Sequence, residues 1–188
     1  MELVTIFVNK DTNEGLYAVR YEEGALDEWE RIFDNWNNTN FVISYLITNE
    51  EALQDDYFQH YTIDDLVTKV HEEADKLIAD FVRETNIDME TLFKPLDPKH
   101  INFDANDVLQ KAKAVIDDNE NYPQPILRVY AIRLTEKTFI ITGGAIKLTH
   151  FMESHHDTRD ELQKLEKVRQ WLLENGIDTQ DDLNYCYE

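Results

Sequence analysis

The chain has 188 residues and a formal net charge of −21, with 39 Asp and Glu against 18 Lys and Arg. A hydrophobic content of 42% is too high for a disordered acidic chain, so we expect one globular domain, 1–188, with a carboxylate-rich surface that excludes broad non-specific nucleic-acid binding. No apolar run is long enough to span a bilayer, the N-terminus lacks signal-peptide features, and Cys186 is the single cysteine, which together favour the cytoplasm.

The first fifty residues predict a hairpin followed by helical cover. Apolar residues alternate over 3–21 on either side of a turn at 10–15, which is typical of a β-hairpin. Three- and four-residue spacing then predicts a helix over 26–36. The segment 41–47, FVISYLI, is β-branched and aromatic enough for a strand, with a short buried helix as the alternative. Thr48 and Glu51 have the spacing of a capping box for a helical turn after it.

The middle of the chain predicts two amphipathic helices. The first covers 63–84 with Thr62 as its N-cap, and the second covers 108–116 after Asp104. These helices are either an insertion, 48–120, within a smaller α+β unit or the outer layer of that unit. The pattern leaves both arrangements open.

The last third predicts strands and a final helix. Two apolar strands, 126–134 and 137–142, flank Thr135-Glu136 as a hairpin. Gly143-Gly144 indicates a bulge or tight bend before a resumed strand at 145–149, and is not a phosphate-binding loop. Thr158 and Glu161 have capping-box spacing for a final helix that ends near Gly176. The whole predicts an α+β fold, with a small antiparallel sheet and amphipathic helices packed on it.

Basic residues are concentrated in 126–176. This segment holds eight basic and seven acidic side chains, a net charge of +1, so the rest of the chain carries −22. A strand places Arg128 on the same face as Tyr130 and Arg133 on the other face. Lys147, after the glycine bend, could meet one of these arginines and an aromatic or a histidine such as His150 at one sheet face. Lys and Arg would stabilise a phosphoryl transition state while His150 served as acid or base, as in metal-free RNA cleavage. The alternative is that Arg128 and Lys147 are ordinary salt-bridging surface groups.

A metal site formed by histidines is a weaker hypothesis. His150, His155 and His156 stand near Asp157, and imidazole and carboxylate are metal ligands. Adjacent histidines point in different directions, however, and no cysteine or HExxH helix completes a ligand shell. We therefore expect neither a metal nor a cofactor.

The C-terminal third resembles the RelE/HigB-like toxin superfamily, especially its phage-derived branch. The shared pattern is an Arg-bearing strand (LRVYAIRL), an apolar strand (KTFIIT), a Gly-then-Lys strand end (GGAIKLT) and an amphipathic final helix (DTRDELQKLEKVRQWL). The resemblance implies a small α+β fold with an antiparallel sheet, ribosome-dependent mRNA cleavage and an antitoxin partner. Arg128 matches the family's strand arginine and Lys147 its post-glycine lysine, with His150 as acid or base. This hypothesis predicts that Arg128 and Lys147 converge in one exposed concavity.

The charge of the chain supports a second hypothesis from a different class. A non-catalytic interaction protein could use its acidic face to bind a basic partner or to imitate nucleic acid. That hypothesis predicts carboxylates over a continuous surface, with Arg128 and Lys147 apart or paired to acids.

Overall fold

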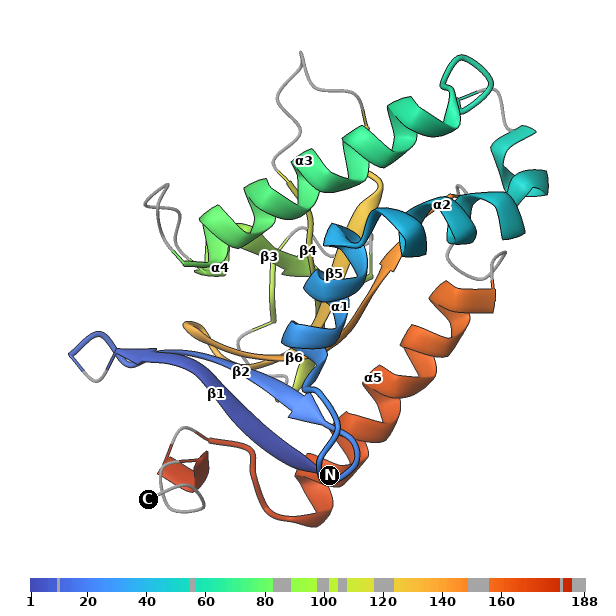
Figure 1. Cartoon of the computed structure of the whole chain (residues 1–188). Coiled ribbons are helices and arrows are strands. Elements are labelled where there is room, and N and C mark those ends of the chain that lie inside the picture. The colour runs from blue at the N-terminus through green and yellow to red at the C-terminus, as the bar shows by residue number, and fades with distance from the viewer. Residues whose placement is uncertain are drawn as a thin grey trace.

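The chain folds as an α+β protein in which helices cover both faces of a six-stranded mixed sheet (Figure 1). The computed structural model describes residues 1–9, 11–54, 57–82, 89–97, 102–104, 108–116, 124–148, 156–179 and 181–183. The strands are β1 (Glu2–Asn9), β2 (Glu14–Arg20), β3 (Phe93–Pro95), β4 (Gln110–Ala114), β5 (Leu127–Thr135) and β6 (Thr138–Ile146). The helices are α1 (Glu28–Asn37), α2 (Thr39–Thr48), α3 (Ile63–Phe81), α4 (Met89–Leu92) and α5 (His156–Glu174), with a 3₁₀ turn η1 (Glu50–Gln54).

The sheet has the strand order β1-β2-β6-β5-β4-β3. The two predicted hairpins are confirmed, because β1 pairs with β2 and β5 with β6, both antiparallel. The sheet is not antiparallel throughout, as β2 and β6, its second and third strands, are parallel neighbours. The three helices α1, α2 and α3 lie in the chain between these two strands. A parallel pair needs such a long crossover connection.

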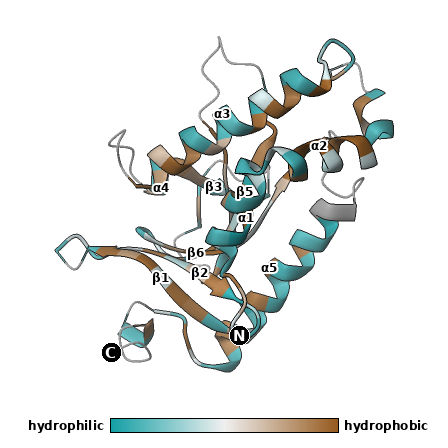
Figure 2. Cartoon of the chain, in the orientation of Figure 1, coloured by the Kyte–Doolittle hydropathy of each residue, from teal (hydrophilic) through white to brown (hydrophobic). Residues whose placement is uncertain are grey.

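Two apolar layers hold the sheet between its helices. On β5, Val129 and Ala131 face the layer that contains α1, α2 and α3. Tyr130 and Ile132 face the opposite layer, which contains α5. Figure 2 shows the resulting pattern, with hydrophobic strands inside and hydrophilic outer faces on α3 and α5. Arg128 therefore lies on the α5 face, as the alternation of the strand predicts. None of the described helices combines the length and apolar character needed to cross a bilayer.

The segment 41–47, predicted as a strand, is instead the helix α2. Its N-cap is Asn38, whose side-chain oxygen accepts the N–H of Phe41 at 3.1 Å. Val42 and Leu46, four residues apart, are both fully buried on the same helix face. The cap and this packing outweigh the β propensity of the segment. Thr48 is the last residue of α2, so it does not form the predicted capping box with Glu51.

The segment 108–116, predicted as a helix, contains the strand β4. Ala112, Ala114 and Ile116 are fully buried, which is the two-residue period of a strand. β4 pairs with β3 on one side and with β5 on the other, both antiparallel. Within 48–120, then, α3 covers one sheet face while β3 and β4 extend the same sheet.

The predicted middle and final helices are present with altered ends. Thr62 and Asp65 form a capping box at the start of α3, which ends at Phe81. α5 begins at His156, so Thr158 lies within the helix and is not its N-cap. Gly176 has a positive φ of 66°, and the N–H of Ile177 bonds to Leu172 O at 2.9 Å, as in a glycine C-cap.

The predicted bulge at Gly143-Gly144 is confirmed. Tyr130 pairs with Gly143 and Ala131 with Ile141, so Thr142 is the extra residue on β6. β6 continues through the bulge to Ile146 without a break.

Candidate functional site

The two predicted cations come together at one end of the α5 face of the sheet. Arg128 pairs with Ala145 across β5 and β6, and Lys147 follows β6, with its N–H bonded to Ile126 O at 2.7 Å. Burial first, and then the positive charges of Arg128 and Lys113, lower the pKa of the Lys147 ammonium. Arg128 is only 9% exposed, so it does not have the open position that the exposed concavity of the toxin hypothesis requires. His150 lies outside the described residues.

Lys113 and Lys94 extend this group across the sheet. Lys113 on β4 pairs with Tyr130, and Lys94 on β3 pairs with Lys113, so both share the α5 face with Arg128. Burial first, and then the charge of Arg128, lower the pKa of Lys113. We call Lys94, Lys113, Arg128 and Lys147 the basic row. The sequence prediction of a helix over 108–116 did not place Lys113 near Arg128. Lys94 joins the basic row only through the pairing of β3 with β4.

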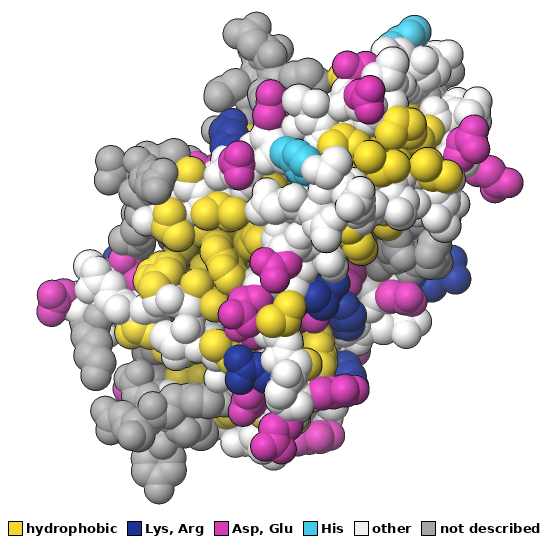
Figure 3. Space-filling model, in the orientation of Figure 1, with side chains coloured by type: hydrophobic (Ala, Val, Ile, Leu, Met, Phe, Trp, Pro, Cys, Tyr) yellow, Lys and Arg dark blue, Asp and Glu magenta, His cyan; other side chains and the backbone are white. Residues whose placement is uncertain are grey.

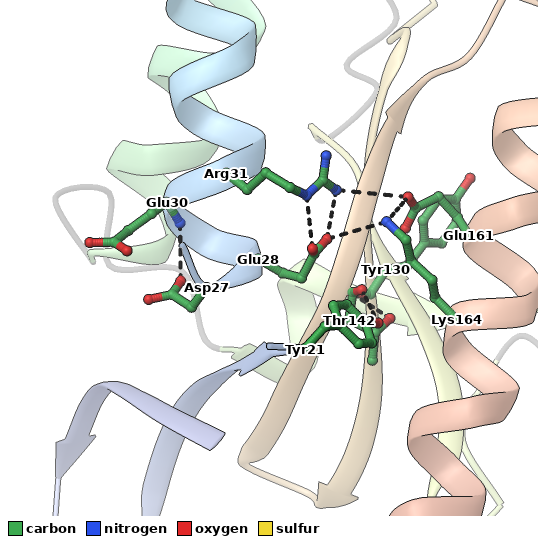
Figure 4. Close-up of polar contacts among 9 residues, drawn as sticks. All are labelled: Tyr21, Asp27, Glu28, Glu30, Arg31, Tyr130, Thr142, Glu161 and Lys164. Carbon is green, nitrogen blue, oxygen red and sulfur yellow. Dashed lines mark hydrogen bonds and ion pairs between the residues drawn. The ribbon is translucent and has the colours of Figure 1, made fainter. Parts of the chain in front are cut away.

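A second charged group lies between α1 and α5, next to Gly143 at the bulge of β6 (Figure 4). Arg31 donates to both oxygens of Glu28, at 2.8 Å and 2.6 Å. Lys164 donates to Glu161 Oε1 at 2.7 Å and lies 3.6 Å from Glu28 Oε2. Both carboxylates are buried, with residue exposures of 3% for Glu28 and 6% for Glu161. We call these four residues the ion cluster.

Glu161 is the carboxylate of the ion cluster whose hydrogen bonding is incomplete among the described residues. Its Oε2 has no hydrogen-bond partner among the described residues and lies against Gly143, which has no side chain. Burial first raises the pKa of Glu161 to about 7; the carboxylate of Glu28 adds to the rise, while Lys164 and Arg31 oppose it. The apolar pattern of α5 does not indicate this burial, since it depends on α1 and α5 meeting.

Two tyrosines adjoin the ion cluster. Tyr21 donates to Thr142 O at 2.8 Å, and burial, followed by the charges of Glu28 and Glu161, raises the pKa of its hydroxyl. The Tyr130 hydroxyl is buried and has no partner within the described chain. Its pKa is raised mainly by burial, with opposite smaller effects from Arg128 and Glu161. Tyr130 therefore lies within electrostatic range of both the basic row and the ion cluster.

We expect the ion cluster to make stability depend on pH. The pKa of Glu161 is about 7 in the folded chain against an ordinary 4.5, so the folded state binds this proton more tightly. The contribution is complete below pH 4.5 and is lost as the pH rises to about 7, by up to about 3 kcal/mol. Urea unfolding of the wild type and of Glu161→Gln at pH 5, 6, 7 and 8 measures the difference.

The matched control for this prediction is Asp160→Asn, which changes the exposed neighbouring carboxylate on the same helix. Its stability should follow the wild-type curve across the same pH series. A wild-type minus Glu161→Gln difference that stays flat from pH 5 to 8 would contradict the prediction.

A cleft of about 310 Å³ opens beside the ion cluster, between α1, α2, β6 and α5. Trp36, Phe41 and Tyr45 form an aromatic wall, and β6 from Gly144 to Ile146 forms the floor. Arg31, Asn35, Asp160, Glu161 and Lys164 line the polar end. We call this space the β6 cleft. Among the described residues, no group of three or more His, Cys, Asp or Glu is placed to hold a metal ion.

Comparison of the chain with protein-family models, with curated protein sequences and with solved structures gives no match. Its function is therefore inferred from the geometry of the basic row, the ion cluster and the β6 cleft.

Proposed function

We propose that this protein is a RelE/HigB-like toxin, a metal-independent endoribonuclease that cleaves mRNA in the cytoplasm and is held in check by an antitoxin. The observation that carries the proposal is the gathering of Arg128 and Lys147 with Lys113 on one face of the sheet. In the described part of the chain, no carboxylate lies within 4.0 Å of the ammonium groups of Lys113 or Lys147. Burial of two lysines beside an arginine disfavours their charged forms, and cations perturbed in this way are frequent at functional sites.

The basic row suits the phosphodiester of RNA. Exposed Lys94 lies opposite Lys113, and Arg128 lies diagonally from Lys113, two residues from the pairing position on β5. A nucleic-acid backbone could follow these cations. Arg128 and Lys147 would stabilise the extra negative charge of the phosphorane transition state. The 2′-hydroxyl oxygen bonds to phosphorus, and the bond from phosphorus to the 5′-oxygen breaks. His150 would take the proton of the 2′-hydroxyl and give a proton to the leaving 5′-oxygen.

Expression in a bacterial host tests the proposal. The wild type should arrest growth, and Lys147→Ala should relieve the arrest, because it removes one cation from the transition-state site. Removal of a single preorganised charge of this kind typically costs about 100-fold or more in rate. Colony counts after induction, together with primer extension on a reporter mRNA, give the readout.

Lys137→Ala is the matched control, since Lys137 is an exposed lysine of the same segment in the β5–β6 turn. It should arrest growth as the wild type does. A wild type that neither arrests growth nor cleaves the reporter, with both proteins expressed in soluble form, contradicts the nuclease proposal.

The surface charge favours a second candidate function. Acidic side chains spread over the face that carries α1, α3 and α5, with fewer basic ones between them (Figure 3). α3 alone presents Asp64, Asp65, Glu72 and Asp75 to solvent. A non-catalytic protein that binds a basic partner, or imitates nucleic acid, would use such a face. A wild type that does not arrest growth would favour the non-catalytic interaction protein over the nuclease.

A further inference from the structure

The β6 cleft contains an open strand edge. β2 pairs with β6 only as far as Ala18 with Ile141, whereas β6 continues to Ile146. No described strand pairs with β6 on that side beyond Ile141. Figure 1 shows this end of β6 rising away from β2 toward α2, with α1 and α5 on either side.

The backbone of Gly144 faces the cleft. The N–H of Lys147 bonds to Ile126 O, so the backbone N–H and C=O of Lys147 point toward the β5 side. Backbone groups alternate in direction along a strand, so those of Ile146 and Gly144 point away from β5. Ile146 agrees with this, because its carbonyl accepts a hydrogen bond from the Tyr45 hydroxyl at 3.0 Å.

Two tyrosine hydroxyls occupy the carbonyls at the ends of the open edge. On one side the Tyr21 hydroxyl occupies Thr142 O, and on the other the Tyr45 hydroxyl occupies Ile146 O. Gly144 keeps both its N–H and its C=O as an adjacent donor and acceptor, and the N–H of Ile146 points in the same direction. With both flanking carbonyls occupied, the edge suits a ligand that uses one donor and one acceptor better than a peptide strand, which pairs over several residues. It matches the adjacent donor and acceptor on one edge of a nucleobase.

The walls of the cleft suit a flat ring. Trp36 packs directly over Gly144, where an added Cβ would come within 2.9 Å of the indole. Phe41 stacks on Tyr45 with 6.3 Å between ring centroids and 21° between planes, and Phe41 is 38% exposed. The volume of about 310 Å³ is at the lower end of small-ligand sites and is enough for one nucleoside. A two-ring base would cover this aromatic wall more fully than a one-ring base.

We propose that the β6 cleft binds the purine base of a nucleotide, with the Gly144 N–H and C=O on the base edge and Phe41 and Tyr45 against its face. The proposal rests on the proposed function for its setting, where RNA would present the base. Ala145 lines the cleft and pairs with Arg128 on β5, so the cleft adjoins the basic row across one strand. Binding of a free mononucleotide involves no cleavage, so either proposal can fail alone.

Isothermal titration calorimetry with adenosine and guanosine 5′-monophosphates tests the inference on the full chain. The wild type should bind at least one of them, and cytidine 5′-monophosphate should bind at least about fivefold more weakly. Phe41→Ala should weaken purine binding by about fivefold or more, the loss expected for one stacked base. Since Phe41 is partly exposed at the mouth of the cleft, the variant is expected to fold.

Ile47→Ala is the matched control, because Ile47 is 59% exposed on the same helix and does not line the cleft. It should bind the purine nucleotide as the wild type does. The inference is overturned if neither purine nucleotide binds at millimolar concentration, if cytidine monophosphate binds equally well, or if Phe41→Ala and Ile47→Ala behave alike.

Discussion

Replacement of Glu73 by alanine should lower the free energy of unfolding by about 3–5 kcal/mol, the range for breaking a buried, hydrogen-bonded ion pair. Glu73 is fully buried on α3, and its Oε1 lies 2.9 Å from the ammonium of Lys69. Its Oε2 accepts the N–H groups of Ile126 at 2.9 Å and Leu127 at 2.8 Å. The substitution leaves two buried backbone donors without this acceptor and removes a partner of a buried cation.

Glu72→Ala is the control for this prediction, because Glu72 is the preceding residue on α3 and is exposed. Its effect should stay within about 0.5 kcal/mol, as for most surface substitutions. Equilibrium urea unfolding of the three proteins gives the comparison. Equal stabilities of Glu73→Ala and the wild type would show that the contacts of Glu73 are replaced in solution.

The same carboxylate connects the core to the candidate site. Glu73 fixes the first residues of β5, and Arg128 is the next residue along that strand. The side chain of Arg128 in turn donates to Leu127 O at 2.7 Å. Loss of Glu73 should therefore displace the arginine on which the proposed cleavage depends, even in molecules that remain folded.

The elements that the sequence predicted correctly are those set by local signals. The β1–β2 and β5–β6 hairpins follow from alternation around turns, and α3 follows from its apolar stripe and the Thr62 cap. α2 and β4 were assigned wrongly because their local patterns are ambiguous. In both, partners distant in sequence decide the outcome, namely the packing of α2 on α1 and α3 and the pairing of β4 with β3 and β5.

The candidate site divides in the same way. The convergence of Arg128 with Lys147 follows from strand alternation and the hairpin, both of which are local. Lys113 joins them through the pairing of β4 with β5, and Glu161 is buried through the meeting of α1 and α5. Contacts between segments that are distant in the chain leave no periodic pattern in the sequence. Gly143 was the available signal, because a glycine within an apolar strand often marks the close approach of another group.

Gly143→Ala should destabilise the fold by about 3 kcal/mol or more, through a collision with the ion cluster. An added Cβ would lie 1.8 Å from Glu161 Oε2 and 3.1 Å from Glu28 Oε2. Overpacking of a full site costs about 1–3 kcal/mol by itself. Here the displaced group is also a buried carboxylate that would have to leave its contact with Lys164 at 2.7 Å. Thermal and urea unfolding of the purified variant measure the loss.

A second substitution separates this collision from a general requirement for glycine at the bulge. In Gly143→Ala/Glu161→Ala the carboxylate that meets the new methyl group is absent, so the double variant should be more stable than the sum of the single effects. Contacting residues typically give interaction energies of about 0.5–3 kcal/mol in such cycles. Additive effects would locate the cost in the backbone of β6 and would contradict the collision. A positive coupling would show that the missing side chain of Gly143 leaves room for Glu161 to be buried against the sheet, and this burial is the main cause of its raised pKa.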